Sequence, residues 1–264
     1  MSTAIVVGAG PCGLGAATAL ANHMDVHLVD RIPVAGGEAG WRSSSVQELV
    51  RQAEQRKVHF RLGATALRWD GHRLLLASPG NISWHAADVL VFAGGRRPGT
   101  AADLQLVGDR PSGVVAATVA EHLIPSTGAA LWRAPLIIGT GRWARRVSAQ
   151  LRALGIPVTG LVPASEECQW ADISHQSTGR IEVIGRKRVE AVRILDPSGP
   201  REIRCDAVIL NGRSVPNRNI DGALSEGAAN ALFAQPLDEE STKGRYWSAY
   251  NTASAWLSEQ GESS

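Results

Sequence analysis

Residues 6–17 of the chain read "VVGAGPCGLGAA". With the preceding "TAI" they begin as a short apolar run, which predicts a strand that is buried on both faces. Gly8, Gly10 and Gly13 then fit the pattern G-x-G-x-x-G. In that pattern the first glycine permits a tight turn, the second lets the backbone approach a pyrophosphate, and the third lets the helix pack close to the strand. The sequence therefore predicts a strand, a glycine turn and a helix of the kind that binds dinucleotides.

The next predicted strand supports this interpretation. Residues 25–30, "DVHLVD", end on Asp30, at the distance from the turn where a ribose hydroxyl needs an acceptor. Strand, turn, helix, strand and acid in this order predict a site for a dinucleotide or another adenine nucleotide. The alternative is a turn that only packs and holds no nucleotide. We expect Cys12 to be a small residue beside the phosphates, although a helix N-terminus lowers the pKa of a thiol.

Composition limits the other possibilities. The 264 residues are 44% hydrophobic and 20% charged, which suits one large α/β domain or two small ones. A net charge of +2 with scattered arginines does not favour nucleic acid, and no apolar run approaches a membrane span. The three cysteines form no CxxC pair and the histidines do not cluster, so we expect no redox dithiol and no metal site. No basic region precedes the first strand, so we expect a cytoplasmic protein without a signal peptide.

Further motifs follow in a recognisable order. "DRIPVAGGEAGWR" (30–42) holds a Gly-Gly pair, and "VFAGGRRPG" (91–99) follows an apolar strand. "APLIIGTGRWARRVSAQLRALGIPVTGLV" (134–162) is a second strand–turn–helix–strand unit, and "IRCDAVILNGRSVPN" (203–217) ends on a Pro-Asn pair. In this order the motifs resemble those of the pyridine nucleotide-disulfide oxidoreductase-like flavoproteins, over residues 3 to about 217.

The resemblance implies an α/β fold with two Rossmann-like dinucleotide-binding domains. An FAD-type domain would cover residues 1–110, an inserted NAD(P)-type domain 111–215, and a shortened C-terminal return segment with a tail 216–264. It implies FAD at the first turn, with ATP or NAD as alternatives because all three share the adenosine half. The residues implied to bind the cofactor are Gly8, Gly10, Pro11, Cys12, Gly13, Asp30, Arg31, Gly37, Glu38, Ala93, Gly94 and Gly95.

Within that group the missing dithiol makes the chain most similar to the α-type subunits of multi-subunit amine oxidases and dehydrogenases. Examples are proline dehydrogenase, sarcosine oxidase, opine oxidase and hydrogen cyanide synthase. The resemblance implies an FAD-dependent oxidoreductase subunit that relays electrons in a heteromeric complex with a substrate-oxidising flavoprotein subunit. No residue of this chain is expected to be a catalytic acid, base or nucleophile. The alternative is a non-catalytic scaffold subunit that binds a nucleotide or has lost it.

The second glycine turn departs from the pattern. A weak second nucleotide site is expected at Gly139, Gly141 and Arg142, but Ala144 replaces the third glycine and bulky Trp143 follows the turn. The strand after this helix ends at residues 161–163 without an acid like Asp30. We therefore expect NAD(P) to bind there weakly or not at all, with Trp143 crowding the mouth of the site.

The C-terminal part of the chain also departs from the motif pattern of these flavoproteins. The "GD" motif that such flavoproteins carry late in the chain is absent after Asn217. Four aromatic residues, Tyr246, Trp247, Tyr250 and Trp256, are spaced as on one helical face. They either pack on the core of this chain or form a docking surface for a partner. If they dock a partner, deletion after Lys243 is expected to spare the first turn.

Overall fold

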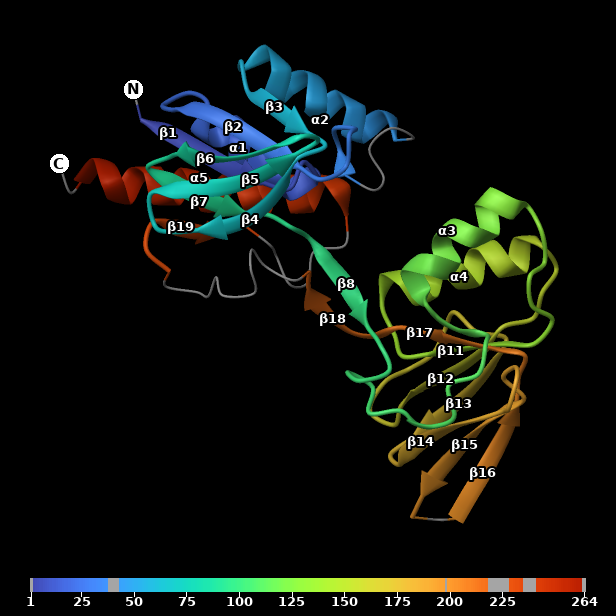
Figure 1. Ribbon diagram of the computed structural model, residues 1–264. Helices are drawn as coiled ribbons and strands as arrows, with labels where there is room; N and C mark the ends of the chain where they lie inside the picture. The colour runs from blue at the N-terminus through green and yellow to red at the C-terminus, as the bar shows by residue number, and fades with distance from the viewer. Residues whose placement is uncertain (1, 38–42, 198, 218–227, 235–240, 263–264) are drawn as a thin grey trace. The chain divides into compact units, whose positions relative to one another are not determined.

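The computed structural model describes residues 2–37, 43–197, 199–217, 228–234 and 241–262 (Figure 1). The chain divides into two compact units, Met1–Arg96 with Pro216–Ser264, and Arg97–Val215. The second unit thus begins before residue 111, where we expected the inserted domain to start. Residues 97–110 belong to it because strand β9 (Val107–Gly108) pairs with strand β14 (Arg180–Ile184), and Leu104 packs against the core of that unit.

A parallel sheet with the strand order β19-β7-β1-β2-β3 forms the centre of the first unit. Its strands are β1 (Thr3–Val7), β2 (Asp25–Asp30), β3 (His59–Leu62), β7 (Val89–Phe92) and β19 (Ala231–Phe233). Strand β1 is paired on both sides, which explains why its sequence is a continuous apolar run. Because β1 and β2 are parallel neighbours, their carboxyl ends bring the glycine turn and Asp30 to the same edge of the sheet.

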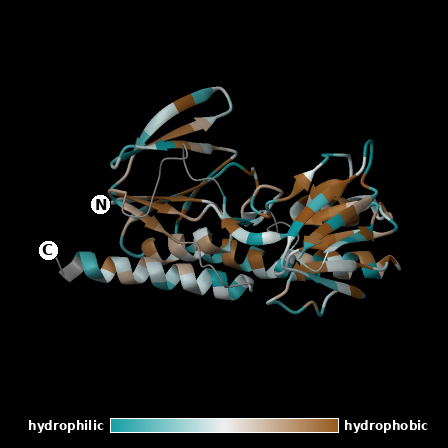
Figure 2. Ribbon diagram, turned by 90° about the horizontal axis from the view of Figure 1, so that it is seen from below, coloured by the Kyte–Doolittle hydropathy of each residue, from teal (hydrophilic) through white to brown (hydrophobic). Residues whose placement is uncertain are grey.

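The first unit also contains the helices α1 (Pro11–Leu20), α2 (Ser44–Gln55) and α5 (Thr242–Glu262). Figure 2 shows α5 running to the C-terminus, mostly in the colours of polar or neutral residues. Its contact with α1 is very close, because a Cβ atom at Gly15 would overlap the backbone carbonyl oxygen of Tyr246. Ala249 and Ala253 are also fully buried. Small residues on both helices allow this approach.

The C-terminal aromatics therefore belong largely to the core of this chain. Tyr246 is 3% exposed, and Tyr250 and Trp256 pack against the same core. The interpretation of this aromatic set as a docking surface is wrong for these three side chains, whereas Trp247 is 54% exposed. Removing the residues after Lys243 would uncover α1, so such a deletion is not a neutral change for the first turn.

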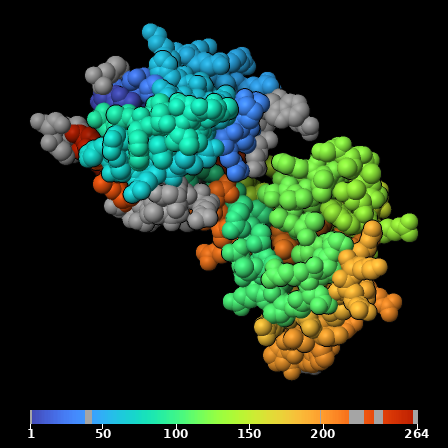
Figure 3. Space-filling model, viewed as in Figure 1, coloured from blue at the N-terminus to red at the C-terminus, as the bar shows by residue number. Residues whose placement is uncertain are grey.

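An antiparallel sheet of β4 (Thr65–Trp69), β5 (Arg73–Ser78) and β6 (Asn81–Ala86) covers part of the parallel sheet. Leu74 and Leu76 of β5 point into the core together with Ile5 and Val29 of the parallel strands. In Figure 3 the segment 65–86 forms much of the visible face of the first unit. Trp84 lies on this outer side, with the Arg73 guanidinium carbon 5.0 Å from the centre of its ring.

The second unit repeats the α/β arrangement. Its parallel sheet has the order β10-β17-β11-β12-β13, with helices α3 (Ala117–Thr127) and α4 (Arg142–Ala153). These strands are β10 (Val114–Ala116), β17 (Ala207–Leu210), β11 (Pro135–Ile138), β12 (Thr159–Pro163) and β13 (Ile173–Ser177). A further sheet contains β9, β14, β15 (Ala191–Asp196) and β16 (Gly199–Arg204), and β8 (Arg96–Gly99) pairs with β18 (Gly212–Pro216). Among the described residues, no helix is long and apolar enough to cross a membrane.

Candidate functional site

Two glycines of the first turn are required by packing. Gly8 has a φ of +109°, and a Cβ atom there would overlap the carbonyl oxygen of Ala93. A Cβ atom at Gly13 would overlap the carbonyl oxygen of Gly8, so only glycine lets α1 lie this close to β1. These contacts are the structural reason for the first and third positions of the motif.

Gly10 is different, because the fold of the described chain does not require it. Its φ of −76° and ψ of −178° are ordinary extended values, and no described atom lies within 4 Å of the position of a Cβ atom. Gly10 is also the N-cap residue of α1, with Pro11 in the first turn. A helix N-terminus attracts anions through its dipole and its unpaired amide groups. The open space beside Gly10 is therefore the place that fits a pyrophosphate.

Asp30 is held at this turn by two backbone groups. Its Oδ2 accepts a hydrogen bond of 2.6 Å from the amide of Ala9, the residue between Gly8 and Gly10. Its Oδ1 accepts one of 2.8 Å from the amide of Ile32. A carboxylate has about four acceptor positions, so capacity remains for ribose hydroxyls. Arg31, the next residue, is exposed.

The Gly-Gly loop lies beside the first turn. The amide of Gly36 donates a hydrogen bond of 2.8 Å to the carbonyl of Ala9. A Cβ atom at Gly37 would come within 3.1 Å of the Cα atom of Gly10. The loop and the turn thus approach each other closely through their backbone atoms. Glu38, which the resemblance also implied as a cofactor contact, lies outside the described residues.

The segment Ala93–Gly95 also reaches this edge, and it is fixed by a residue that the sequence analysis did not select. The amide of Ala93 donates to the carbonyl of Val7 over 2.8 Å. The side-chain Nδ2 of Asn217 donates to the carbonyl of Gly94 over 2.7 Å, and its backbone amide donates to the carbonyl of Gly95 over 2.9 Å. Asn217 therefore joins the segment that follows β18 to the segment that follows β7 through these two hydrogen bonds. Its signal in the sequence was the Pro-Asn pair at the end of residues 203–217.

Cys12 is 9% exposed and forms part of the core around α1. The structure thus brings together at one edge of the first sheet all the proposed contacts that it describes, except for the solvent-directed Arg31. The glycines, backbone amides and carboxylate among them are groups suited to binding and orienting a ligand.

The second glycine turn requires glycine at its first position as the first turn does, but at its second position the positive φ of Gly141 itself requires glycine, unlike the extended backbone of Gly10. Gly139 has a φ of +99°, and a Cβ atom there would overlap the carbonyl oxygen of Asn211. Gly141 has a φ of +105°, and no described atom lies within 4 Å of its Cβ position. The expected crowding by Trp143 is wrong, because this side chain is 6% exposed and packs in the core beside Val147. The arginine beside it, Arg142, stacks its guanidinium carbon 4.2 Å from the centre of the Trp143 ring.

An acid does reach the second turn, from beyond the end of β12. Oε2 of Glu166 accepts a hydrogen bond from the hydroxyl of Thr140, the residue between Gly139 and Gly141. The carbonyl of Thr140 accepts a hydrogen bond from Nδ2 of Asn211, whose side chain is fully buried. Sequence reasoning missed Glu166 because it looked for an acid at the strand end, and this acid lies three residues after Pro163.

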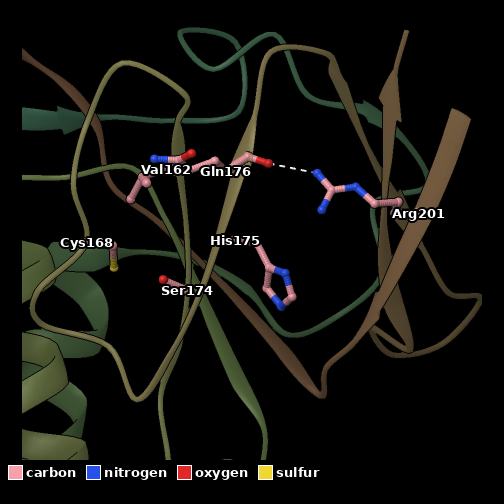
Figure 4. A pocket seen from close by; sticks show the side chains of 6 residues that line it. All are labelled: Val162, Cys168, Ser174, His175, Gln176 and Arg201. Carbon is pink, nitrogen blue, oxygen red and sulfur yellow. Dashed lines mark hydrogen bonds between the residues drawn. The ribbon is translucent and has the colours of Figure 1, made fainter. Parts of the chain in front are cut away.

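A cavity of about 360 Å³ borders strand β13 and contains Cys168 and His175 among its lining residues (Figure 4). These two groups do not form a nucleophile–base pair. Cys168 packs on the side of the sheet that faces the cluster around α3 and α4, together with Gly160, whose strand neighbour is Ser174. His175 follows Ser174 and points to the opposite side, as successive strand residues do. Burial also raises the pKa of the Cys168 thiol, which disfavours its nucleophilic form.

Three histidines of the first unit lie near one another, His27 and His59 as partners on the neighbouring strands β2 and β3 and His85 on β6. His27 and His59 stack with ring centres 5.2 Å apart, and Asp25 accepts from both. Nδ1 of His85 lies 3.0 Å from the guanidinium of Arg61. Burial and the nearby Arg61 charge lower the pKa values of His27 and His85. Among the described residues, no group of His, Cys, Asp and Glu side chains is arranged to hold a metal ion.

Comparison with known proteins agrees with this geometry. Residues 6–74 match the NAD(P)-binding Rossmann-like domain family, and no curated protein sequence matches the chain. L-proline dehydrogenase from P. horikoshii superimposes with a TM-score of 0.67 at 18% identity, over 98% of this chain and 56% of that one. A pyridine nucleotide-disulfide family oxidoreductase from Enterococcus faecalis V583 gives 0.66 at 14% identity, over 95% and 68%. Thioredoxin reductase from Lactococcus lactis gives 0.66 at 13% identity, over 98% and 100%.

The matched proteins thus extend in most cases well beyond this chain, which spans 56% of the length of the proline dehydrogenase. The likeness covers both units of the chain and confirms the expected α/β class and the resemblance to two-domain dinucleotide-binding proteins. The chain therefore has the dinucleotide-binding fold of the flavoprotein oxidoreductases, with a Rossmann-like domain at residues 6–74.

Proposed function

We propose that this chain is an FAD-dependent oxidoreductase subunit. It binds the adenosine and pyrophosphate part of the cofactor at the first turn, and it relays electrons within a multi-subunit dehydrogenase or oxidase that acts on an amine or amino acid. The observation that carries the proposal is the open position at Gly10 between a helix N-terminus and the Asp30 carboxylate. Packing explains Gly8 and Gly13, whereas no described atom crowds the Cβ position of Gly10, and a ligand that approaches the backbone there would account for this glycine.

The residues present fit such a group in distinct roles. The backbone of Gly10 and the first turn of α1 would hold the pyrophosphate, and Asp30 would accept hydrogen bonds from the ribose of the adenosine half. Ala93, Gly94 and Gly95 bring a side-chain-poor segment to the same edge, where a bulky ligand needs room. When bound, the flavin would supply the electron-transfer chemistry. The chain binds and orients it.

The proposed substrate class rests on similarity to other proteins and not on a substrate pocket in this chain. The first solved structure in the comparison is an L-proline dehydrogenase, and the motif order resembles the α-type subunits of amine oxidases. The described part of this chain shows no nucleophile–base pair at the first turn. From the same resemblance we propose a separate flavoprotein subunit as the partner that oxidises the substrate.

A second candidate is a non-catalytic scaffold subunit that keeps a nucleotide for structural reasons. It is favoured by the end of β19, where the sequence continues as Ala234-Gln235 and not as a Gly-Asp pair. Ala234 is 1% exposed and its amide donates to the carbonyl of Phe92, so the return strand is present although the motif is not. Such a chain would hold ATP, NAD or another adenine nucleotide at the same turn.

The visible absorption spectrum of the purified full chain separates the two candidates. The proposal expects flavin bands that bleach on reduction by dithionite. A folded but colourless protein with a bound adenine nucleotide would support the scaffold instead. A folded protein without any nucleotide would overturn the proposal and would leave only a scaffold that has lost its nucleotide.

A further inference from the structure

A cavity of about 170 Å³ lies between the two sheets of the first unit, and we call it the inter-sheet cavity. Its polar lining comes from both sheets: Thr3 of β1, His27 of β2 and Arg61 of β3 on the parallel side, and His85 of β6 on the antiparallel side. Apolar side chains of the core complete the wall.

The inter-sheet cavity is separate from the nucleotide position at the first turn. It borders the face of β1 that carries Ile5, which packs in the core under the antiparallel sheet. Helix α1 packs on the opposite face of β1, with Ala4 and Val6. Thr3 is the first residue of β1, whereas the glycine turn follows the last one. A nucleotide at Gly10 therefore does not account for this cavity.

The charge that lines the inter-sheet cavity is positive. The Arg61 guanidinium has five N–H donors, and its hydrogen bond within the described chain goes to a ring nitrogen, Nδ1 of His85, over 3.0 Å. None of the ion pairs among the described residues includes Arg61. Two acids lie nearby, but Asp25 pairs with two histidines and Asp88 accepts from the Thr3 amide, and neither lines the cavity. The cavity thus presents a cation that no described carboxylate pairs with.

The two histidines of the cavity wall have hydrogen-bonding capacity for a ligand. A guanidinium only donates, so Nδ1 of His85 accepts from Arg61 and this ring is neutral. Nδ1 of His27 is buried without a partner among the described residues, while Nε2 of the same ring lies 3.3 Å from Asp25. A buried polar atom without a partner is rare in a folded protein. On protonation this nitrogen becomes a donor, which suits an anionic ligand.

We propose that the inter-sheet cavity binds a small oxyanion, the carboxylate or phosphate group of a small molecule, and that Arg61 holds its charge. The planar guanidinium matches two oxygens of either group in a fork. The cavity has room for a group of several non-hydrogen atoms, since a water molecule takes up about 30 Å³ in the liquid. Arg61 is exposed, so the anion reaches it from solvent. This site goes beyond the proposed function and does not depend on which nucleotide fills the first turn.

A bound anion should change the titration of both histidines. Burial and then the Arg61 charge lower the pKa of His27, the nearby His59 lowers it further, and Asp25 on the same strand raises it. Burial, Arg61 and His27 lower the pKa of His85 in that order. An anion beside Arg61 would offset its charge and raise both pKa values. Binding therefore takes up protons and should become stronger as the pH falls towards about 6.

The test follows the ring signals of His27 and His85 by NMR in the full chain. Sodium acetate and sodium phosphate are the probes, and sodium chloride at the same ionic strength is the control. Both signals of the wild type should shift to saturation with acetate or phosphate, and the lower half-saturation concentration identifies the preferred group. At saturation both rings should titrate at a higher pH than in chloride.

Variants show whether Arg61 holds the anion. Arg61→Gln should raise the half-saturation concentration at least about 10-fold, since charge-assisted hydrogen bonds are lost. Arg61→Lys, which keeps the charge but not the fork, should lie between this variant and the wild type. Arg68→Gln is the matched control and should keep the wild-type value, because Arg68 is also exposed, on β4, and does not line the cavity.

Equal responses of the wild type to chloride and to both probes would overturn the inference, as would the absence of saturation. An unchanged half-saturation concentration in Arg61→Gln would overturn it too. A loss in Arg68→Gln as large as that in Arg61→Gln would show a general effect of surface charge and would also contradict the site. The proposed function is tested separately, by the flavin that denaturation releases from the first turn.

Discussion

Replacement of Gly10 by valine separates ligand binding from folding better than any other change at the first turn. Its backbone is extended, with a φ of −76°, so a β-branched residue is not strained there. No described atom lies within 4 Å of the new Cβ, so the variant has room in the free protein. The side chain would instead occupy the space that we assign to the pyrophosphate.

The substitution should change the free energy of unfolding much less than the free energy of nucleotide binding. Valine is a poorer N-cap residue than glycine, but loss of a glycine also restricts the unfolded chain, so the free energy of unfolding should change by no more than about 1 kcal/mol. Binding should lose two or more charge-assisted hydrogen bonds to the phosphates, about 3 kcal/mol or more, which is at least about a 100-fold loss of affinity. Ligand binding should therefore be abolished in a protein that is still folded.

The assay measures urea unfolding of Gly10→Val together with the nucleotide that denaturation releases from it. Gly13→Ala is the contrasting variant, because its Cβ would overlap the carbonyl oxygen of Gly8, and it should lose stability as well as nucleotide. A folded Gly10→Val protein with its full complement of nucleotide would refute the assignment of this turn. Marked unfolding of Gly10→Val would refute the claim that the fold does not require this glycine.

Three further outcomes are expected. Asp30→Ala should weaken nucleotide binding at the first turn by about 1–3 kcal/mol in a titration, and an unchanged affinity would require a different ribose partner. Gly15→Ala should lower the free energy of urea unfolding by about 1–3 kcal/mol, since its Cβ meets the Tyr246 carbonyl, and no change would contradict the close packing of α1 and α5. Folding lowers the pKa of His27 and His85 below 6.5, so the unfolded chain binds more protons than the folded chain just below that pH. The free energy of unfolding should therefore fall as the pH drops below about 6.5. This fall should be less steep in His27→Gln, which lacks one of the two histidines.

The sequence was sufficient for the elements whose patterns are local. The run before Gly8, the spacing to Asp30 and the strand–turn–helix–strand segment at residues 134–162 each fit a short template, and the structure has strands and helices there. Strand β19 was harder to predict, since it has three residues and lacks the Gly-Asp pair that would mark it. Its position depends on pairing with β7, a partner more than a hundred residues away.

The side-chain environment of the second turn was less accessible from sequence. The position of Trp143 directly after the glycines indicates the mouth of the site, yet helical spacing puts it with Val147 and Leu151 on the buried face of α4. Glu166 was missed because its approach to Thr140 depends on a turn after β12 that no short motif encodes. The spacing of Tyr246 fits both a core position and an interface, since aromatic spacing alone does not tell which surface a helix meets.

The most informative measurement is mass spectrometry of the small molecules that the purified chain releases on denaturation, quantified per chain. The proposed function predicts close to one FAD per chain from the wild type and almost none from Gly10→Val. Release of an adenine nucleotide without flavin, or of no nucleotide from a folded wild-type protein, would contradict the assignment of this chain as a flavin-binding oxidoreductase subunit.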